Sequence, residues 1–252
     1  MNRHPAPARP ALSRWARHVA LFGHLAGGLL MVFLWYPWIS RDHKQKLKAC
    51  WSRRLVSILG LEIVLDGTVP DGVLLVANHV SWIDIFALNA VAPSAFVAKS
   101  EIARWPLVGA LCRQTETLFI ERGSPRHAQH VAHTMAEQLR SGQRIALFPE
   151  GTTTEGHEIL PFHAALFQPA ISAGVAIQPV SIRYRDATGK ISNAPAYAGE
   201  TTLGETIRFT LNCTGLQVQL TALPLIHATD FNNRRDIARR AETTIREQLL
   251  KD

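Results

Sequence analysis

A histidine and an aspartate stand five positions apart, at His79 and Asp84, directly after the apolar run of residues 73–77. A neutral imidazole takes a proton from a hydroxyl near neutral pH, and a carboxylate on its other ring nitrogen fixes the tautomer and stabilises the imidazolium. The pattern predicts a general base and its orienting group at the end of a buried strand. The alternative is a hydrogen-bonded histidine beside a helix-capping aspartate, with Ser81 capping the same helix.

A second polar turn, residues 148–154, also follows an apolar run directly, and it carries Glu150, Gly151 and Thr152. In an α/β sheet, ligands bind beyond the carboxyl ends of the strands, so turns that each end a strand can face one crevice. We therefore expect the two turns to meet and to form one site.

Four ordered segments resemble the motifs of the 1-acylglycerol-3-phosphate acyltransferase family of glycerolipid and lysophospholipid acyltransferases: Asn78-His79-x-Ser81-x-x-Asp84, Phe119-Ile120-Glu121-Arg122, Phe148-Pro149-Glu150-Gly151-Thr152 and Gln178-Pro179-Val180. The first of them is the His-x4-Asp motif. The segment Lys99-x-Glu101, with Pro106 and Gly109, is similar to the one that the family carries between the first two motifs. A single motif of this kind is weak, whereas four in order are specific.

The resemblance implies an O-acyltransferase that moves a fatty acyl group from acyl carrier protein or coenzyme A to the free hydroxyl of a lysolipid. A thioester is already activated, so the reaction needs a base and an oxyanion stabiliser but no serine or cysteine nucleophile, no cofactor and no metal. His79 is then the expected base, worth about 10²- to 10⁴-fold in rate, and Asp84 its orienter. Backbone N–H groups of one of the two turns are expected to hold the oxyanion.

The resemblance also implies that Arg122, Glu150, Gly151 and Thr152 bind the substrate. The planar fork of an arginine suits a phosphate because it donates two parallel hydrogen bonds. Glycine lets the backbone approach a ligand closely. The expected acceptor is 1-acylglycerol-3-phosphate, which would give phosphatidic acid in phospholipid biosynthesis.

Two positions depart from the family pattern and open a second possibility for the acceptor. Thr153 stands where the family commonly has an arginine, and His163 stands where it often has a lysine. Each loss removes a charge-assisted hydrogen bond of roughly 1.5 to 3 kcal/mol from the place expected for a phosphate monoester. Lyso-ornithine lipid or another lysophospholipid is therefore the alternative acceptor.

Two other classes of protein remain to be separated from an acyltransferase. A thioester or ester hydrolase would use the same histidine and aspartate, although the sequence has no Gly-x-Ser-x-Gly elbow for a serine nucleophile. A non-catalytic lipid-binding or membrane-tethering protein would need only the basic N-terminal segment. Acyl release into water would support the former, and function without His79 would support the latter.

The composition favours an anionic partner in a reducing compartment. The net charge is +7 and the pI about 9.8, which suits acidic lipid headgroups, phosphate-bearing substrates or nucleic acid. The charge does not choose between them, but the resemblance favours a lipid and no nucleic acid. The three cysteines are scattered and predict neither a disulfide framework nor a zinc site.

The N-terminal part of the chain is expected to bind a membrane. Residues 1–18 form a basic, proline-containing lead, and residues 19–39 are apolar over the length of a bilayer-crossing helix, with aromatic residues at one end. Cleavage as a signal peptide is disfavoured because no small-x-small site follows. Basic residues on both flanks leave a span and a shallow hairpin open. We expect association with the inner (cytoplasmic) membrane, with the catalytic domain facing the cytosol.

Residues 44–60 predict an amphipathic helix with an apolar stripe and a cationic remainder. Such a helix is expected on an anionic lipid surface, and the alternative is a helix packed on the core with its basic face in water. These segments define an N-terminal region, 1–60, of basic lead and membrane-binding helices.

The remainder, 61–252, alternates short apolar runs with helical stretches and predicts one α/β domain with a mixed or largely parallel sheet flanked by helices. Strands are expected at 61–65, 73–77, 95–98, 117–120, 145–148, 177–182 and 217–222. Helices are expected at 84–91, 105–112, 124–140, 162–173 and 233–250. The third of these helices has the clearest limits, with Ser124 as N-cap and Gly142 as stop.

Overall fold

The computed structural model describes residues 14–105, 108–121, 123–231 and 233–251. A seven-stranded sheet organises them, with the strand order β1-β7-β6-β2-β5-β3-β4. All neighbouring strands run parallel except β6 and β7, which pair in the antiparallel sense. The fold class predicted from the sequence, a mixed and largely parallel sheet with flanking helices, is confirmed.

The strands lie close to the predicted ranges: β1 Leu61–Asp66, β2 Leu74–Ala77, β3 Ala95–Lys99, β4 Leu118–Ile120, β5 Ile145–Leu147, β6 Ile177–Arg185 and β7 Leu216–Ala222. The α-helices are α1 Arg14–Leu34, α2 Arg41–Ile58, α3 Ile83–Val91, α4 Val108–Gln114, α5 Pro125–Arg140, α6 Gln168–Ala173, α7 Leu203–Asn212 and α8 Arg234–Lys251. Short 3-10 helices occur at Tyr36–Trp38, Ser100–Arg104, Ala164–Phe167 and Ala228–Asp230.

Helix α7 was not predicted, although the sequence contains a signal for it. Thr202 accepts a hydrogen bond from the Glu205 backbone N–H, and the Glu205 carboxylate accepts one from the Thr202 N–H, which is a capping box. In α5, the predicted N-cap is confirmed, because Ser124 accepts a hydrogen bond from the His127 N–H.

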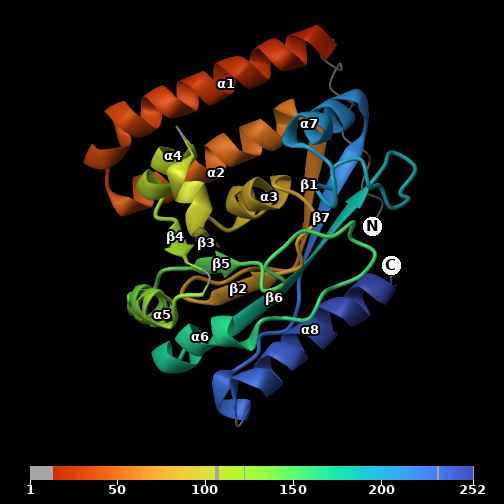
Figure 1. The fold of residues 1–252 in the computed structure, drawn as a ribbon. Coiled ribbons are helices and arrows are strands. Elements are labelled where there is room, and N and C mark those ends of the chain that lie inside the picture. The colour runs from red at the N-terminus through yellow and green to blue at the C-terminus, as the bar shows by residue number, and fades with distance from the viewer. Residues whose placement is uncertain (1–13, 106–107, 122, 232, 252) are drawn as a thin grey trace.

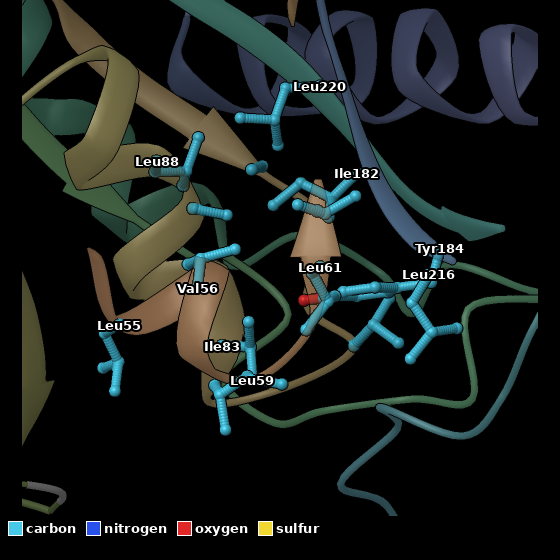
Figure 2. Packing of buried hydrophobic residues seen from close by; sticks show 14 of the residues in the cluster. Leu55, Val56, Leu59, Leu61, Ile83, Leu88, Ile182, Tyr184, Leu216 and Leu220 are labelled. Carbon is cyan, nitrogen blue, oxygen red and sulfur yellow. The ribbon is translucent and has the colours of Figure 1, made fainter. Parts of the chain in front are cut away.

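The sheet separates two hydrophobic clusters, and helices cover both of its faces (Figure 1). Helices α2 and α3 cover one face and pack with Leu75 and Ile182 of the sheet, as Figure 2 shows in part. Helices α5, α6 and α8 cover the other face, where Leu74, Leu147 and Ile177 point. The strands β2, β5 and β6 lie between the two layers, and this explains their almost continuous apolar sequence.

Helix α2 packs on the core rather than presenting its apolar stripe to a lipid surface. Leu55, Ile58 and Leu59 are at most 5% exposed and belong to the same cluster as Leu75 and Ile182. Of the two predictions made for residues 44–60, the core-packed helix is therefore the one that the structure shows. The described part of residues 1–60 shares a core with the sheet.

Helix α1 lies along α2 and packs against it through one of its faces (Figure 1). The ring of His24 stacks on Trp51 at 4.6 Å between centroids, and His24 Nε2 lies 3.0 Å from the Trp51 carbonyl oxygen. A Cβ on Gly28 would stand 2.4 Å from the Trp51 Nε1, so the glycine permits this approach. Arg17 donates to the Leu211 carbonyl at the end of α7. The first thirteen residues, part of the basic lead, lie outside the described residues.

Candidate active site

The two polar turns meet because they follow neighbouring parallel strands. Val76 of β2 is paired with Leu147 of β5, so the chain leaves both strands at the same edge of the sheet. His79 and Phe148 then lie face to face, with ring centroids 3.8 Å apart and an angle of 5° between the planes. The predicted convergence of the turns is therefore present in the structure.

His79 and Asp84 form a hydrogen-bonded pair. His79 Nδ1 lies 2.8 Å from Asp84 Oδ2, and this oxygen also accepts the backbone N–H groups of Val80 at 2.7 Å and Ser81 at 2.9 Å. The Asp84 side chain is fully buried, whereas the His79 side chain is 17% exposed. Because Nδ1 is engaged by the carboxylate, Nε2 is the ring nitrogen left for an incoming hydroxyl.

Two residues at this site were missed by the sequence reasoning or assigned no role. The Tyr184 hydroxyl of β6 donates to the second oxygen of Asp84, Oδ1, at 2.5 Å. The Asn78 amide donates to the Ile182 carbonyl at 3.0 Å, and its own oxygen accepts the Ile182 N–H at 2.8 Å. Both contacts span a hundred positions of the chain or more, and no local pattern around residue 184 indicated them.

Glu150 is buried, with 4% of its surface exposed, and its carboxylate holds two segments of backbone. One oxygen accepts the His79 N–H at 2.8 Å and the other accepts the Leu160 N–H at 2.9 Å. Burial raises the pKa of the Glu150 carboxyl to about 7, against the lowering effect of these two hydrogen bonds. Both carboxylate oxygens are thus engaged by the protein itself.

The rest of the second turn passes close to the backbone of His79. Gly151 adopts a left-handed conformation with φ at 70°, and its N–H donates to the Phe148 carbonyl. Thr152 is exposed, which leaves it open to a ligand. The Thr154 N–H donates to the His79 carbonyl at 2.8 Å, so a backbone hydrogen bond joins the second turn to the first.

The two positions that depart from the family pattern differ in their surroundings. The Thr153 hydroxyl donates to the Tyr197 carbonyl, and His163 is exposed. Arg122, the predicted phosphate ligand, and Pro106 lie outside the described residues.

A surface cavity of about 550 Å³ adjoins the second turn. Among the described residues, two carboxylates and no lysine or arginine line it; the lining residues are Thr153, Thr154, Glu155, His157, Glu158, Leu160, Ala198 and Gly199. Within the described ranges, no group of three or more histidine, cysteine, aspartate or glutamate side chains is arranged to hold a metal ion.

Comparison with known proteins decides the family. Residues 61–183 match the protein family described as Acyltransferase. The chain is also 33% identical to the lyso-ornithine lipid O-acyltransferase of Rhodobacter capsulatus over 200 residues, which cover 77% of this chain and 72% of that protein. This chain belongs to the glycerolipid and lysophospholipid acyltransferases. The four motifs on which the resemblance rested all lie within the matched residues.

Members of the family with two different acceptors in their names resemble this chain. It is 49% identical over 129 residues to the 1-acyl-sn-glycerol-3-phosphate acyltransferase of Neisseria gonorrhoeae, covering 51% of each chain. It is 46% identical over 143 residues to the lyso-ornithine lipid O-acyltransferase of Pseudomonas aeruginosa, covering 56% of this chain and 55% of that protein. The matched region thus spans about half the length of these two relatives.

A solved acyltransferase structure shares the fold. The crystal structure of the 1-acyl-sn-glycerophosphate acyltransferase from Thermotoga maritima superimposes with a TM-score of 0.69 over 95% of this chain and 97% of that one, at 20% identity.

Proposed function

We propose that this protein transfers a fatty acyl group from the thioester of acyl carrier protein or coenzyme A to the free hydroxyl of a lysolipid. The observation that carries the proposal is the His79–Asp84 pair, which engages Nδ1 and leaves Nε2 as a base at the carboxyl end of β2. Family membership supplies the reaction class, and the buried carboxylate beside the imidazole supplies the means of proton transfer.

In the proposed reaction, His79 Nε2 takes the proton of the lysolipid hydroxyl while the hydroxyl oxygen attacks the thioester carbonyl. The tetrahedral intermediate then collapses, the carbon–sulfur bond breaks, and the imidazolium returns the proton to the leaving thiolate. No covalent acyl-enzyme forms. Asp84 stabilises the imidazolium in between, and backbone N–H groups of the turn containing Gly151 and Thr152 are the proposed oxyanion donors.

The proposed roles of the remaining site residues differ in how directly they meet substrate. We propose that the backbone at Gly151 and Thr152 contacts the acceptor and that Arg122 binds its phosphate. For Glu150 we propose a positioning role instead of acceptor contact, because the His79 and Leu160 N–H groups already engage both of its oxygens.

For the acceptor, 1-acylglycerol-3-phosphate remains the first candidate, and lyso-ornithine lipid is the second. The second is favoured by a specific observation, the cavity whose described lining residues include Glu155 and Glu158 but no lysine or arginine. Carboxylates attract the ammonium group of an amino-acid head and repel a phosphate monoester. Thr153 adds to this difference, because its hydroxyl is engaged by the Tyr197 carbonyl and bears no charge.

We also propose that the protein lies on the surface of the inner membrane, on its cytosolic side, with α1 in the plane of the lipid headgroups. The helix is long and apolar enough to cross a bilayer, but one of its faces is packed on α2. The outer face is apolar and exposed along its whole length; it comprises Trp15, Val19, Phe22, Leu25, Leu30, Phe33 and Leu34, continued by Trp35 and Trp38. A face of this kind, next to basic residues, is typical of an interfacial helix on anionic lipids.

The experiment that tests the proposal is an acyl-transfer assay with purified protein in micelles. One labelled acyl thioester is offered with lysophosphatidic acid, lyso-ornithine lipid or lysophosphatidylcholine in turn, and the products are separated as diacyl lipid and free fatty acid. We expect diacyl lipid with at least one acceptor. Release of fatty acid at the same rate with and without acceptor would identify a hydrolase and refute the proposal.

A further inference from the structure

Strand β6 extends beyond the strand that carries the proposed base. Ile177 to Val180 pair with all four residues of β2, and the remaining five residues of β6 continue past the point where β2 ends. Tyr184 lies on this extension, on the same face as Val180 and Ile182. Figure 2 shows its side chain running from β6 into the cluster that contains Leu61 and Ile83.

The two oxygens of Asp84 have very different surroundings. Oδ2 accepts three hydrogen bonds, from His79 and from the backbone of Val80 and Ser81. Oδ1 has a single donor within the described residues, the Tyr184 hydroxyl. Because Asp84 has no exposed surface, bulk solvent has no direct access to this oxygen.

The phenol of Tyr184 is itself held in place. The residue is 2% exposed and belongs to the buried cluster that contains Val180 and Ile182. Burial, with the nearby charge of Asp84, raises the pKa of Tyr184 well above its usual value, so the hydroxyl stays protonated and donates throughout the range of enzyme assays. The result is a buried chain of hydrogen bonds that runs from Tyr184 through Asp84 to His79.

We propose that Tyr184 is a positioning residue for the acyl transfer, which fixes the plane of the Asp84 carboxylate and thereby the direction of His79 Nε2. The inference rests on the proposed function, and it adds a third side chain to the base and its orienter. A carboxylate with one unpaired oxygen would rotate or shift toward another donor. The bond from Oδ2 to His79 would then lengthen, and the imidazolium formed during the reaction would lose stabilisation.

The test compares Tyr184→Phe with Tyr36→Phe. Both tyrosines are 2% exposed, and the Tyr36 oxygen has no hydrogen-bond partner in the described part of the chain, so the two variants remove the same atom from equally buried rings. We expect Tyr184→Phe to lower kcat about 10- to 100-fold with the KM of both substrates unchanged, since one bond to a charged group is lost. Tyr36→Phe should leave kcat unchanged.

A double-mutant cycle separates positioning from general loss of structure. In an Asp84→Asn background, Tyr184→Phe should change kcat less than about threefold, because the two residues act through one hydrogen bond. Equal loss in both backgrounds, or a kcat within about twofold of wild type in the single variant, would overturn the inference. If Tyr184→Phe does not fold, the NMR signal of the Tyr184 hydroxyl proton in tyrosine-labelled protein decides: a shift of this signal in Asp84→Asn supports the inference, and an unchanged signal refutes it.

A measurement independent of activity keeps this inference distinct from the proposed function. The proton shared by His79 Nδ1 and Asp84 should give a low-field NMR resonance in histidine-labelled protein, absent in His79→Ala. Tyr184→Phe should shift or broaden this resonance, and Tyr36→Phe should not. An unchanged resonance in Tyr184→Phe would overturn the inference even if acyl transfer is found, whereas a changed one supports it even if no acceptor is acylated.

Discussion

The substitution Glu150→Gln separates two roles for the buried carboxylate. As a positioning group, Glu150 accepts the N–H groups of His79 and Leu160 through its two oxygens. A glutamine keeps one oxygen but presents an NH₂ group to the second N–H, which is left unsatisfied at a cost of about 1 to 3 kcal/mol. Because the backbone of His79 moves with it, kcat should fall at least about tenfold, with the KM for the acceptor unchanged.

The pH dependence of stability gives the second part of this prediction. The pKa of Glu150 is about 7 in the folded protein and near its ordinary value of 4.5 when unfolded. Between these two pH values the folded state keeps a proton on Glu150 that the unfolded state has lost. The contribution of this proton to the free energy of unfolding is therefore greatest below pH 4.5 and is lost as pH rises through 7. A difference of this size corresponds to roughly 3 kcal/mol.

Unfolding by urea at pH 5 and pH 8, in detergent micelles, measures both effects. At pH 5 Glu150→Gln should be less stable than wild type by about 1 to 3 kcal/mol. At pH 8 this gap should close or reverse, because the wild type then buries a charge and the glutamine does not. The reasoning fails if the gap is the same at both pH values, or if the variant raises the KM for the acceptor while kcat stays near wild type, as an acceptor ligand would.

Three further predictions concern the membrane, the headgroup and the helix packing. Phe22→Asp on the outer face of α1 should weaken binding to anionic vesicles about tenfold or more in a sedimentation assay. The reason is that a side chain whose burial contributes about 1.5 to 3 kcal/mol is replaced by a charge. Val64→Asp on β1 should leave vesicle binding unchanged. Thr153→Arg should raise the ratio of kcat/KM for lysophosphatidic acid over lyso-ornithine lipid about tenfold, and an unchanged ratio would refute the charge explanation of this position. Gly28→Leu should lower the melting temperature, because a Cβ at this position would stand 2.4 Å from the Trp51 indole of α2. Such overpacking costs about 1 to 3 kcal/mol. Gly27→Leu should leave the melting temperature unchanged, because a Cβ there meets nothing within 4 Å.

The sequence predicted the elements whose signals are local. The apolar runs before His79 and Phe148 marked β2 and β5, and the rule that ligands gather beyond parallel strands brought their turns together. The five-residue spacing placed Asp84 on the first turn of α3, where it reaches back to His79. These predictions needed only periodicity and chain direction.

The contacts that the sequence did not predict depend on residues far apart in the chain. Tyr184 reaches Asp84 across a hundred positions, and nothing in the strand pattern around it distinguishes its hydroxyl from an ordinary core side chain. The family resemblance suggested a ligand at Glu150, but its hydrogen bonds to the backbone depend on how two loops pack. The apolar stripe of α2 was compatible both with packing on the protein core and with binding to a membrane. Helical periodicity shows that a helix is amphipathic, but it does not show what its apolar face contacts.

The most direct test of the central claim is the rate of acyl transfer to a lysolipid by His79→Ala, compared with His133→Ala. His133 is exposed on α5, where it pairs with Glu137. We predict a fall in kcat of at least about 100-fold for His79→Ala, with lysolipid binding retained, and no change for His133→Ala. Turnover by His79→Ala near the wild-type rate would contradict the assignment of His79 as the base.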